Sequence, residues 1–167
     1  MEMMAARLDS VAKYLCRFSG WMLSNLQLQK IIYISQMEYM GENNGERLVD
    51  ARFEAWDNGP VIPELYHKVK AFGASPVRDV FSEARRFRED DPRVHMLERI
   101  CGALIDKRPA ALIELTHWEH GAWAKNYVPG VKGLPIPDRD ILAEFKERKR
   151  ISGQWRASSA EDTICAT

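Results

Sequence analysis

Three titratable residues near position 120 have the types and spacing of a metal site. His117, Glu119 and His120 lie within LTHWEHGAW, and two histidines three residues apart can share one face of a helix. This is not an HExxH motif, however, and the sequence offers no evident third ligand. The structural alternative is that His117 lies in the last turn of a helix, where it bonds terminal carbonyls and suits the helix dipole. We favour the structural interpretation over a small metal-dependent hydrolase.

Glu64 and His67 form a second candidate pair for acid–base chemistry. They lie three residues apart on one face of a predicted helix, a spacing that general acid–base catalysis can use. Neither a partnered nucleophile nor a glycine-rich phosphate loop accompanies them. We interpret the pair as part of a solvated surface and expect the protein not to be an enzyme.

Composition limits the remaining function classes. The chain has 167 residues, enough for one domain with its own core, and 24 basic residues balance 24 acidic ones. This balance argues against wholesale binding to nucleic acid or anionic membranes, although local patches remain. Cys16, Cys101 and Cys165 form no CxxC, so neither a zinc ribbon nor a redox pair is supported. With no signal peptide or membrane span visible, we expect a cytoplasmic protein without cofactors.

Helices are the elements that must position these residues. Ser24 and Gln27 resemble a capping box, and the segment that follows, 26–40, is apolar on most sides, so we expect it at the buried centre. Apolar residues recur at helical spacing in seven segments, which we predict to be helices: 8–18, 26–40, 62–72, 77–87, 94–104, 109–115 and 138–150.

The remaining segments predict a small β element and loops. Alternation over residues 49–55 predicts one short, half-exposed strand. We predict turns or loops at 41–46, 57–59 and 124–137, from their glycine, asparagine and proline content. Residues 151–167 are expected to form a disordered tail. The predicted fold is mainly α: a compact single-domain helical bundle over residues 1–150 with a minor short β element.

The stretch FEAWDNGPVIPELYHKVKAFG, residues 53–73, is best explained as a structural corner. Trp56 is a large apolar plate at a strand end, and Gly59-Pro60 fixes the reversal before the next helix. We therefore predict that five bulky or rigid residues belong largely to the core: Trp56, Pro60, Leu65, Tyr66 and Trp123.

Three blocks of this sequence resemble Panacea-domain antitoxins, a family also described as GepA-like or SocA-like. The blocks are LQLQKIIYISQ (26–36), FEAWDNGPVIPELY (53–66) and LTHWEHGAW (115–123), in the order and approximate spacing of the family. The resemblance spans about residues 8–145. One departure is Asn58, where an aromatic residue is frequent in the family. The resemblance assigns structural roles to the motif residues Leu28, Gln29, Lys30, Tyr33, Ala55, Trp56, Gly59, Pro60, Val61, Tyr66, Leu115, Thr116, His117 and Trp123.

The resemblance implies a non-enzymatic protein that binds and neutralises a co-encoded toxin. In this family, the resemblance implies, one helical scaffold is paired with many unrelated toxins. Two modes of action are implied: direct sequestration, and a SocA-like role as an adaptor that delivers the toxin to an ATP-dependent protease of the ClpXP type.

Two basic clusters leave three interpretations open. They comprise Arg85, Arg86 and Arg88, and the run from Lys146 to Arg150. We favour a solvated face, since acidic residues are interleaved; the alternatives are weak binding to operator DNA and contact with a protein partner. Because a scaffold with many partners should vary its surface, we predict partner contacts at Arg52, Glu54, Asp57, Asn58, Arg78, Phe81, Arg85, Arg86 and Tyr127. For Phe81 the alternative is that it covers the core.

Overall fold

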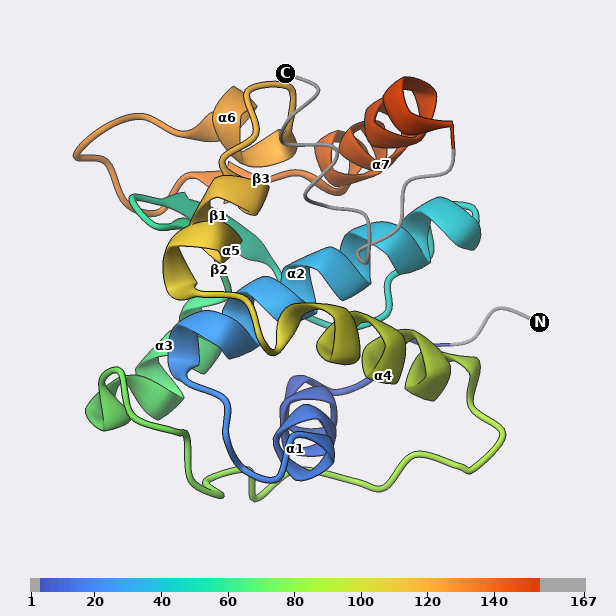
Figure 1. Cartoon of the computed structure of the whole chain (residues 1–167), viewed down its shortest axis with the longest axis vertical. Helices are drawn as coiled ribbons and strands as arrows, with labels where there is room; N and C mark the ends of the chain where they lie inside the picture. The colour runs from blue at the N-terminus through green and yellow to red at the C-terminus, as the bar shows by residue number, and fades with distance from the viewer. Residues whose placement is uncertain (1–3, 154–167) are drawn as a thin grey trace.

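A computed structural model describes residues 4–153 and confirms a mainly helical, single-domain fold (Figure 1). A single turn of 3-10 helix, η1 (Lys70–Phe72), follows α3. The α-helices are α1 (Leu8–Phe18), α2 (Asn25–Glu42), α3 (Pro63–Val69), α4 (Pro92–Leu104), α5 (Pro109–Thr116), α6 (Ala122–Asn126) and α7 (Asp138–Ser152). The strands are β1 (Phe53–Trp56), β2 (Gly59–Val61) and β3 (Pro135–Ile136).

Helix α2 forms the centre of the domain, as its apolar pattern predicted. It contacts α1, α3, α4, α5, α7 and β2, and Figure 1 shows it crossing the middle of the molecule with α1 and α4 below it and the sheet above. Every side chain from Leu28 to Met40 is buried. The predicted capping box is present: Ser24 N–H donates to Gln27 Oε1 at 2.9 Å, and Gln27 N–H donates to Ser24 Oγ at 3.3 Å.

The β element is larger than the single strand that was predicted. Its three strands are antiparallel in the order β2-β1-β3, with Trp56 opposite Gly59 and Phe53 opposite Ile136. Thus Pro135–Ile136, predicted to be loop, forms an edge strand, where a proline does not interrupt a ladder. Residues 49–52 are not in this sheet; Val49 forms an isolated parallel bridge with Ala6. The short strand β3 could not be read from periodicity because it spans only two residues.

The helix predicted over residues 77–87 is wrong. Residues 73–91, which we call the 73–91 loop, contain no helix and run beside α1 (Figure 1). Val77 and Phe81 are buried at 1% and 3% exposure, so their spacing records two anchor points of a loop on the core. The backbone bonds that a helix would need go elsewhere: Glu83 N–H donates to Asp9 Oδ2 at 3.1 Å, and Arg85 N–H donates to Ser10 Oγ at 2.8 Å.

The basic C-terminal helix α7 does not present all its charges to solvent. Glu144 and Arg148 are both fully buried, and Arg148 Nε donates to Glu144 Oε2 at 2.9 Å. The Glu144 Oε1 atom also accepts from Tyr33 Oη at 2.7 Å and from Ala122 N–H at 2.9 Å. The favoured interpretation of this cluster as a solvated face is therefore wrong for Arg148, although Lys146, Lys149 and Arg150 are exposed.

The end of the chain differs from its predicted boundary by two residues. Helix α7 continues through Ser152, whereas the tail was predicted to start at residue 151. Residues 154–167 lie outside the described part of the chain. No helix within residues 4–153 is long and apolar enough to cross a membrane.

Candidate protein-interaction surfaces

Polar side chains of α2 hold the corner formed by β1, β2 and α3. Gln29 bonds both backbone groups of Ile62: its Nε2 donates to Ile62 O at 3.2 Å, and its Oε1 accepts from Ile62 N–H at 2.8 Å. Gln36 accepts from the N–H groups of Leu48 and Val49 at 2.8 and 3.0 Å. These side-chain amides satisfy backbone groups of Leu48, Val49 and Ile62, which lie outside the three strands. The sequence signal that could have revealed this role is a glutamine repeated after seven residues in a largely apolar helix.

Lys30 is a buried cation at the centre of this corner. Its side chain is 1% exposed, and Nζ donates to Pro60 O at 2.9 Å. Within residues 4–153 no carboxylate pairs with it, and burial lowers its pKa from 10.5 to about 7. Gly59 covers the ammonium so closely that an added Cβ would lie 3.0 Å from Nζ and 2.8 Å from Thr116 Oγ1. With a φ of +111°, position 59 therefore requires glycine for both space and backbone conformation.

A stack of three rings leads from this corner to the surface. His117 lies flat on Trp123 with a centroid distance of 3.6 Å, and Trp123 stacks on Tyr127 at 4.4 Å. Trp123 Nε1 donates to Trp56 O at 2.7 Å, and Tyr127 Oη donates to Asp57 Oδ1 at 2.5 Å. The stack therefore ties α6 and the loop after it to the β1–β2 turn.

The geometry of His117 gives no support to a metal site. Its ring stacks inside the fold, whereas His120 is exposed and contacts Glu119 at 3.3 Å. Burial, followed by the charge of Lys30, lowers the pKa of His117 below its ordinary value, so the ring is neutral near pH 7. Nε2 is buried without a hydrogen-bond partner in the described part of the chain. Residues 4–153 contain no group of three or more His, Cys, Asp or Glu side chains that could hold a metal ion.

Most predicted core residues of the corner are buried, but two are not fully covered. Pro60, Leu65 and Trp123 are buried, whereas Trp56 and Tyr66 are half-buried and pack edge to face at 4.8 Å. The ammonium of Lys132 lies 4.9 Å from the centre of the Trp56 ring. The predicted acid–base pair, Glu64 and His67, is exposed on α3.

The rim of this corner is polar and accessible. Arg52, Asp57 and Asn58 are exposed, and the half-buried Glu54 accepts a hydrogen bond from Trp56 Nε1 at 2.9 Å. The rim therefore offers a set of polar groups around one aromatic ring, of which Glu54 and Asp57 are held by hydrogen bonds.

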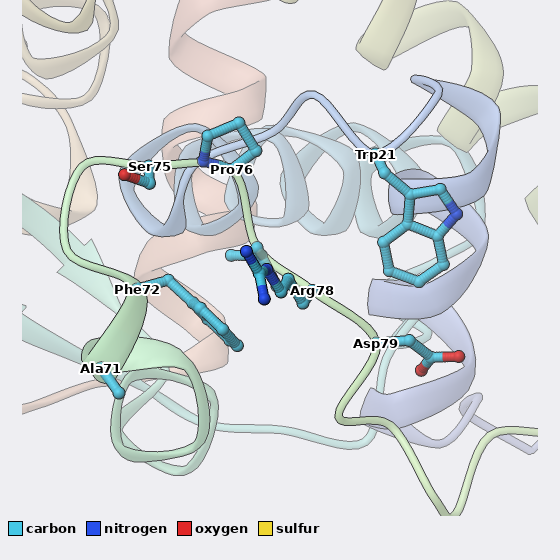
Figure 2. Close-up of a pocket in the computed structure, with 8 residues that line it drawn as sticks. Trp21, Ala71, Phe72, Ser75, Pro76, Arg78 and Asp79 are labelled. Carbon is cyan, nitrogen blue, oxygen red and sulfur yellow. The ribbon is translucent and has the colours of Figure 1, made fainter.

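A cavity of about 710 Å³ opens beside the α1–α2 turn. Figure 2 shows Phe72 and Arg78 on one side of it, with Trp21 and Asp79 on the other. Trp21 comes from the turn between α1 and α2, and the other residues come from η1 and the chain after it. Two exposed apolar side chains lie nearby in the sequence: Met22, at 63% exposure, and Val80, at 37%. The lining residues are Trp21, Ala71, Phe72, Ser75, Pro76, Val77, Arg78 and Asp79.

A second cavity of about 590 Å³ lies between α1 and the 73–91 loop. We call it the basic groove; its lining residues are Ser10, Lys13, Tyr14, Arg17, Phe18, Ala84, Arg85, Arg86 and Phe87. The ion pair between Lys13 Nζ and Asp79 Oδ2, at 3.0 Å, joins its rim to that of the first cavity. Of the predicted contact residues on this loop, Arg78, Arg85 and Arg86 are exposed. Phe81 is buried in the core, so it provides no exposed contact surface.

Comparison with known proteins identifies the scaffold that carries these surfaces. The family described as "Antitoxin SocA-like, Panacea domain" matches residues 28–124, a segment that contains every motif residue of the corner. The chain belongs to the SocA-like Panacea family. It is also similar to antitoxin SocA of Caulobacter vibrioides (strain NA1000 / CB15N), with 29% identity over 140 residues, 76% of this chain and 74% of that protein. No solved structure matches the chain.

The segment that matches the Panacea family contains the whole corner but only part of the basic groove. Lys30, Gly59 and the His117–Trp123 stack lie within the matched segment, and so does the loop half of the basic groove. The α1 half of that groove, from Ser10 to Phe18, precedes the segment. The groove therefore combines a part of the Panacea scaffold with a helix outside the matched segment.

Proposed function

We propose that this protein is an antitoxin that neutralises a toxin encoded beside it by binding the toxin directly. The observation that carries the proposal is the match of residues 28–124 to the SocA-like Panacea family, together with the similarity to an antitoxin across 76% of the chain. On this proposal the protein acts by binding in the cytoplasm, and its buried polar residues serve the scaffold.

Two exposed surfaces are held in place by hydrogen bonds to the rest of the fold, which supports a binding role. The 73–91 loop is irregular, yet its backbone bonds to Asp9 and Ser10 of α1. Asp9 is itself held by an ion pair with Lys68 at 2.7 Å. A loop that is fixed before binding loses little conformational entropy when a partner docks. At the corner rim, Asp57 is likewise held before binding, because it accepts a hydrogen bond from Tyr127 of the ring stack.

Co-expression with the neighbouring gene tests the proposal. The neighbour alone should stop growth, and this protein should restore it. A neighbour that is harmless alone, or one that stays toxic in the presence of this protein, would refute the proposal. Purified toxin and antitoxin should also co-elute in size-exclusion chromatography.

A finer form of the proposal concerns the fate of the bound toxin. We propose two routes, sequestration and delivery to an ATP-dependent protease, which the lifetime of the toxin separates. After synthesis is blocked, delivery shortens the half-life of the toxin only when this protein is present, and deletion of the protease restores it. Sequestration leaves the half-life unchanged or prolongs it.

Weak binding to operator DNA is the alternative function. Its basis is the exposed basic residues Arg85, Arg86, Lys146 and Lys149, with acidic residues interleaved. The burial of Arg148 removes one cation from this set. A gel shift with the protein's own promoter, repeated across salt concentrations, tests the alternative, because phosphate contacts weaken steeply with salt.

A further inference from the structure

The basic groove has an unbalanced charge in a chain with no net charge. Its lining contains Lys13, Arg17, Arg85 and Arg86 but no carboxylate. Lys13 is neutralised by Asp79 at 3.0 Å. Within residues 4–153 none of the three arginines forms an ion pair, and all three are exposed. The groove therefore presents three exposed guanidinium groups, of which Arg17 is partly balanced by the nearby charge of Asp79 and Arg85 and Arg86 have no ion-pair partner in the described part of the chain.

The same groove has an apolar floor. Tyr14 and Phe87 pack edge to face at 5.7 Å, and Phe18 at the end of α1 is 47% exposed. The hydroxyl of Tyr14 donates to Glu98 Oε1 at 2.5 Å, which fixes the ring on α4. The guanidinium of Arg93, which does not line the groove, lies 5.5 Å from the centre of the Phe87 ring. Aromatic rings beside arginines are the side chains that contribute most to protein–protein binding energy.

The walls of the groove are held in place without a partner. The amide of Arg85 is bonded to Ser10 Oγ at 2.8 Å, and Ser10 is 6% exposed. Because this bond joins the loop to α1, the backbone of Arg85 is held at a fixed distance from α1 before binding. Such preorganisation reduces the entropy that a partner's docking must overcome.

We propose that the basic groove receives an acidic polypeptide segment of the toxin that carries at least one exposed aromatic or large aliphatic side chain. Carboxylates of this segment pair with Arg17, Arg85 and Arg86, and its apolar side chain covers Phe18 and the Tyr14–Phe87 floor. The inference rests on the proposed function for the identity of the partner. Complementary charge steers such an encounter, whereas burial of the apolar anchor holds the complex.

A polypeptide fits the groove better than a nucleic acid does. The loop that supplies Arg85 and Arg86 also carries Glu83, Glu89 and Asp90, all exposed and outside the lining of the groove, so the positive charge is confined to the groove and does not continue as a track for an extended phosphate backbone. The floor offers apolar surface that a phosphate cannot use. A volume of about 590 Å³ is suited to a few side chains of one segment rather than to a duplex.

Charge reversal with a matched control tests the inference. The test variant combines Arg17→Glu, Arg85→Glu and Arg86→Glu. The control combines Arg139→Glu, Lys146→Glu and Lys149→Glu, three exposed residues of α7, and changes the net charge by the same amount. A third variant, Phe18→Ser, removes the apolar anchor. Thermal melts of all variants should stay close to wild type, because the altered side chains are surface ones.

The primary measurement is the Kd of each variant for the purified product of the neighbouring gene at several salt concentrations. The test variant should raise Kd at least about tenfold and flatten the salt dependence, while the control stays within about twofold. Phe18→Ser should raise Kd and keep the salt dependence of wild type. A folded test variant that binds and neutralises like wild type would overturn the inference and leave the proposed function intact.

Two synthetic probes separate this inference from the proposed function. One is a fluorescent 12-residue peptide in which Asp and Glu alternate with Leu and Phe; the other is a DNA duplex of 12 base pairs. If the neighbouring gene's product does not bind, peptide binding by wild type and the control but not by the test variant would still support the groove chemistry. Failure of both the toxin and the peptide to bind wild type refutes the inference. Binding of the duplex, lost in the test variant, refutes it in favour of nucleic acid.

Discussion

Replacing Lys30 by methionine should stabilise the protein near neutral pH. Methionine has a similar length but no charge, so it fits the same space under Gly59 without an ammonium. The wild-type side chain is 1% exposed and bonds only to the Pro60 carbonyl among the contacts described above. A buried cation without a carboxylate partner opposes folding, because its charged form loses hydration.

The magnitude follows from the pKa of Lys30. Its fall from 10.5 to about 7 corresponds to roughly 4–5 kcal/mol of lost stability at pH 7, at about 1.36 kcal/mol for each pH unit. Methionine leaves the Pro60 carbonyl without its donor, which costs about 1–3 kcal/mol. The net gain is then about 1–4 kcal/mol, the range observed when buried charges are replaced by apolar residues. For a chain of this size, at about 2–4 °C for each kcal/mol, that gain is a rise in Tm of about 2–16 °C.

The pH dependence of this gain has a definite sign. Between pH 7 and 10.5 the unfolded chain binds a proton on Lys30 and the folded chain does not, so wild-type stability rises with pH across this window. Above the window both states are neutral, and below it both are protonated. Lys30→Met should therefore be more stable than wild type at pH 7, and the difference should decline toward pH 10.

Urea unfolding monitored by tryptophan fluorescence, at half-unit steps from pH 6.5 to 10, measures this difference. The control is Lys146→Met, an exposed site on α7 where the change should stay within about 0.5 kcal/mol at every pH. If Lys30→Met is less stable than wild type at pH 7, or if the difference does not change with pH, then the bond to Pro60 outweighs burial and the reasoning above is wrong.

Four other substitutions probe the packing described here. Gly41→Ala should destabilise the protein although alanine is the better helix former, because its Cβ would lie 2.0 Å from the Phe145 ring of α7. Gly102→Ala in α4, where the added Cβ meets open space, should stabilise the protein by about 0.5–1 kcal/mol. Equal effects of the two substitutions in thermal melts would contradict this packing. Arg148→Leu should cost about 3–5 kcal/mol in urea unfolding, because it leaves the Glu144 carboxylate buried without its cation; a neutral result would show that the bonds from Tyr33 and Ala122 are enough to hold this carboxylate. Asp9→Ala should accelerate amide hydrogen exchange across the 73–91 loop while slow exchange in α2 persists; unchanged exchange would show that the loop is held by its apolar anchors alone.

Local patterns of the sequence were enough for most of the helices. Six of the seven predicted helices exist, because each buries one apolar face and shows it as a 3.6-residue period. The capping box at Ser24 and the prolines at the starts of α3, α4 and α5 act within one turn of chain, so their roles are visible locally. The family also followed from the sequence, since three separate blocks occur together in one order.

The tertiary structure decided the features that depend on distant partners. The 73–91 loop shows helical spacing because Val77 and Phe81 both anchor on the core, but its amides bond to Asp9 and Ser10, some 75 residues earlier. Periodicity records which side chains are buried and not where the backbone bonds go.

The candidate sites depend on tertiary structure for the same reason. A glutamate and an arginine four residues apart are typical of a solvated helix face, and only the packing of α7 on α2 and α5 buries Glu144 with Arg148. The basic groove joins α1 to a loop more than 60 residues away, so no window of sequence contains it. The sequence by itself determined the family, the helical class and the central helix. The three-dimensional fold alone decided which charges are buried and which are exposed, because burial and pairing are set by contacts between distant segments.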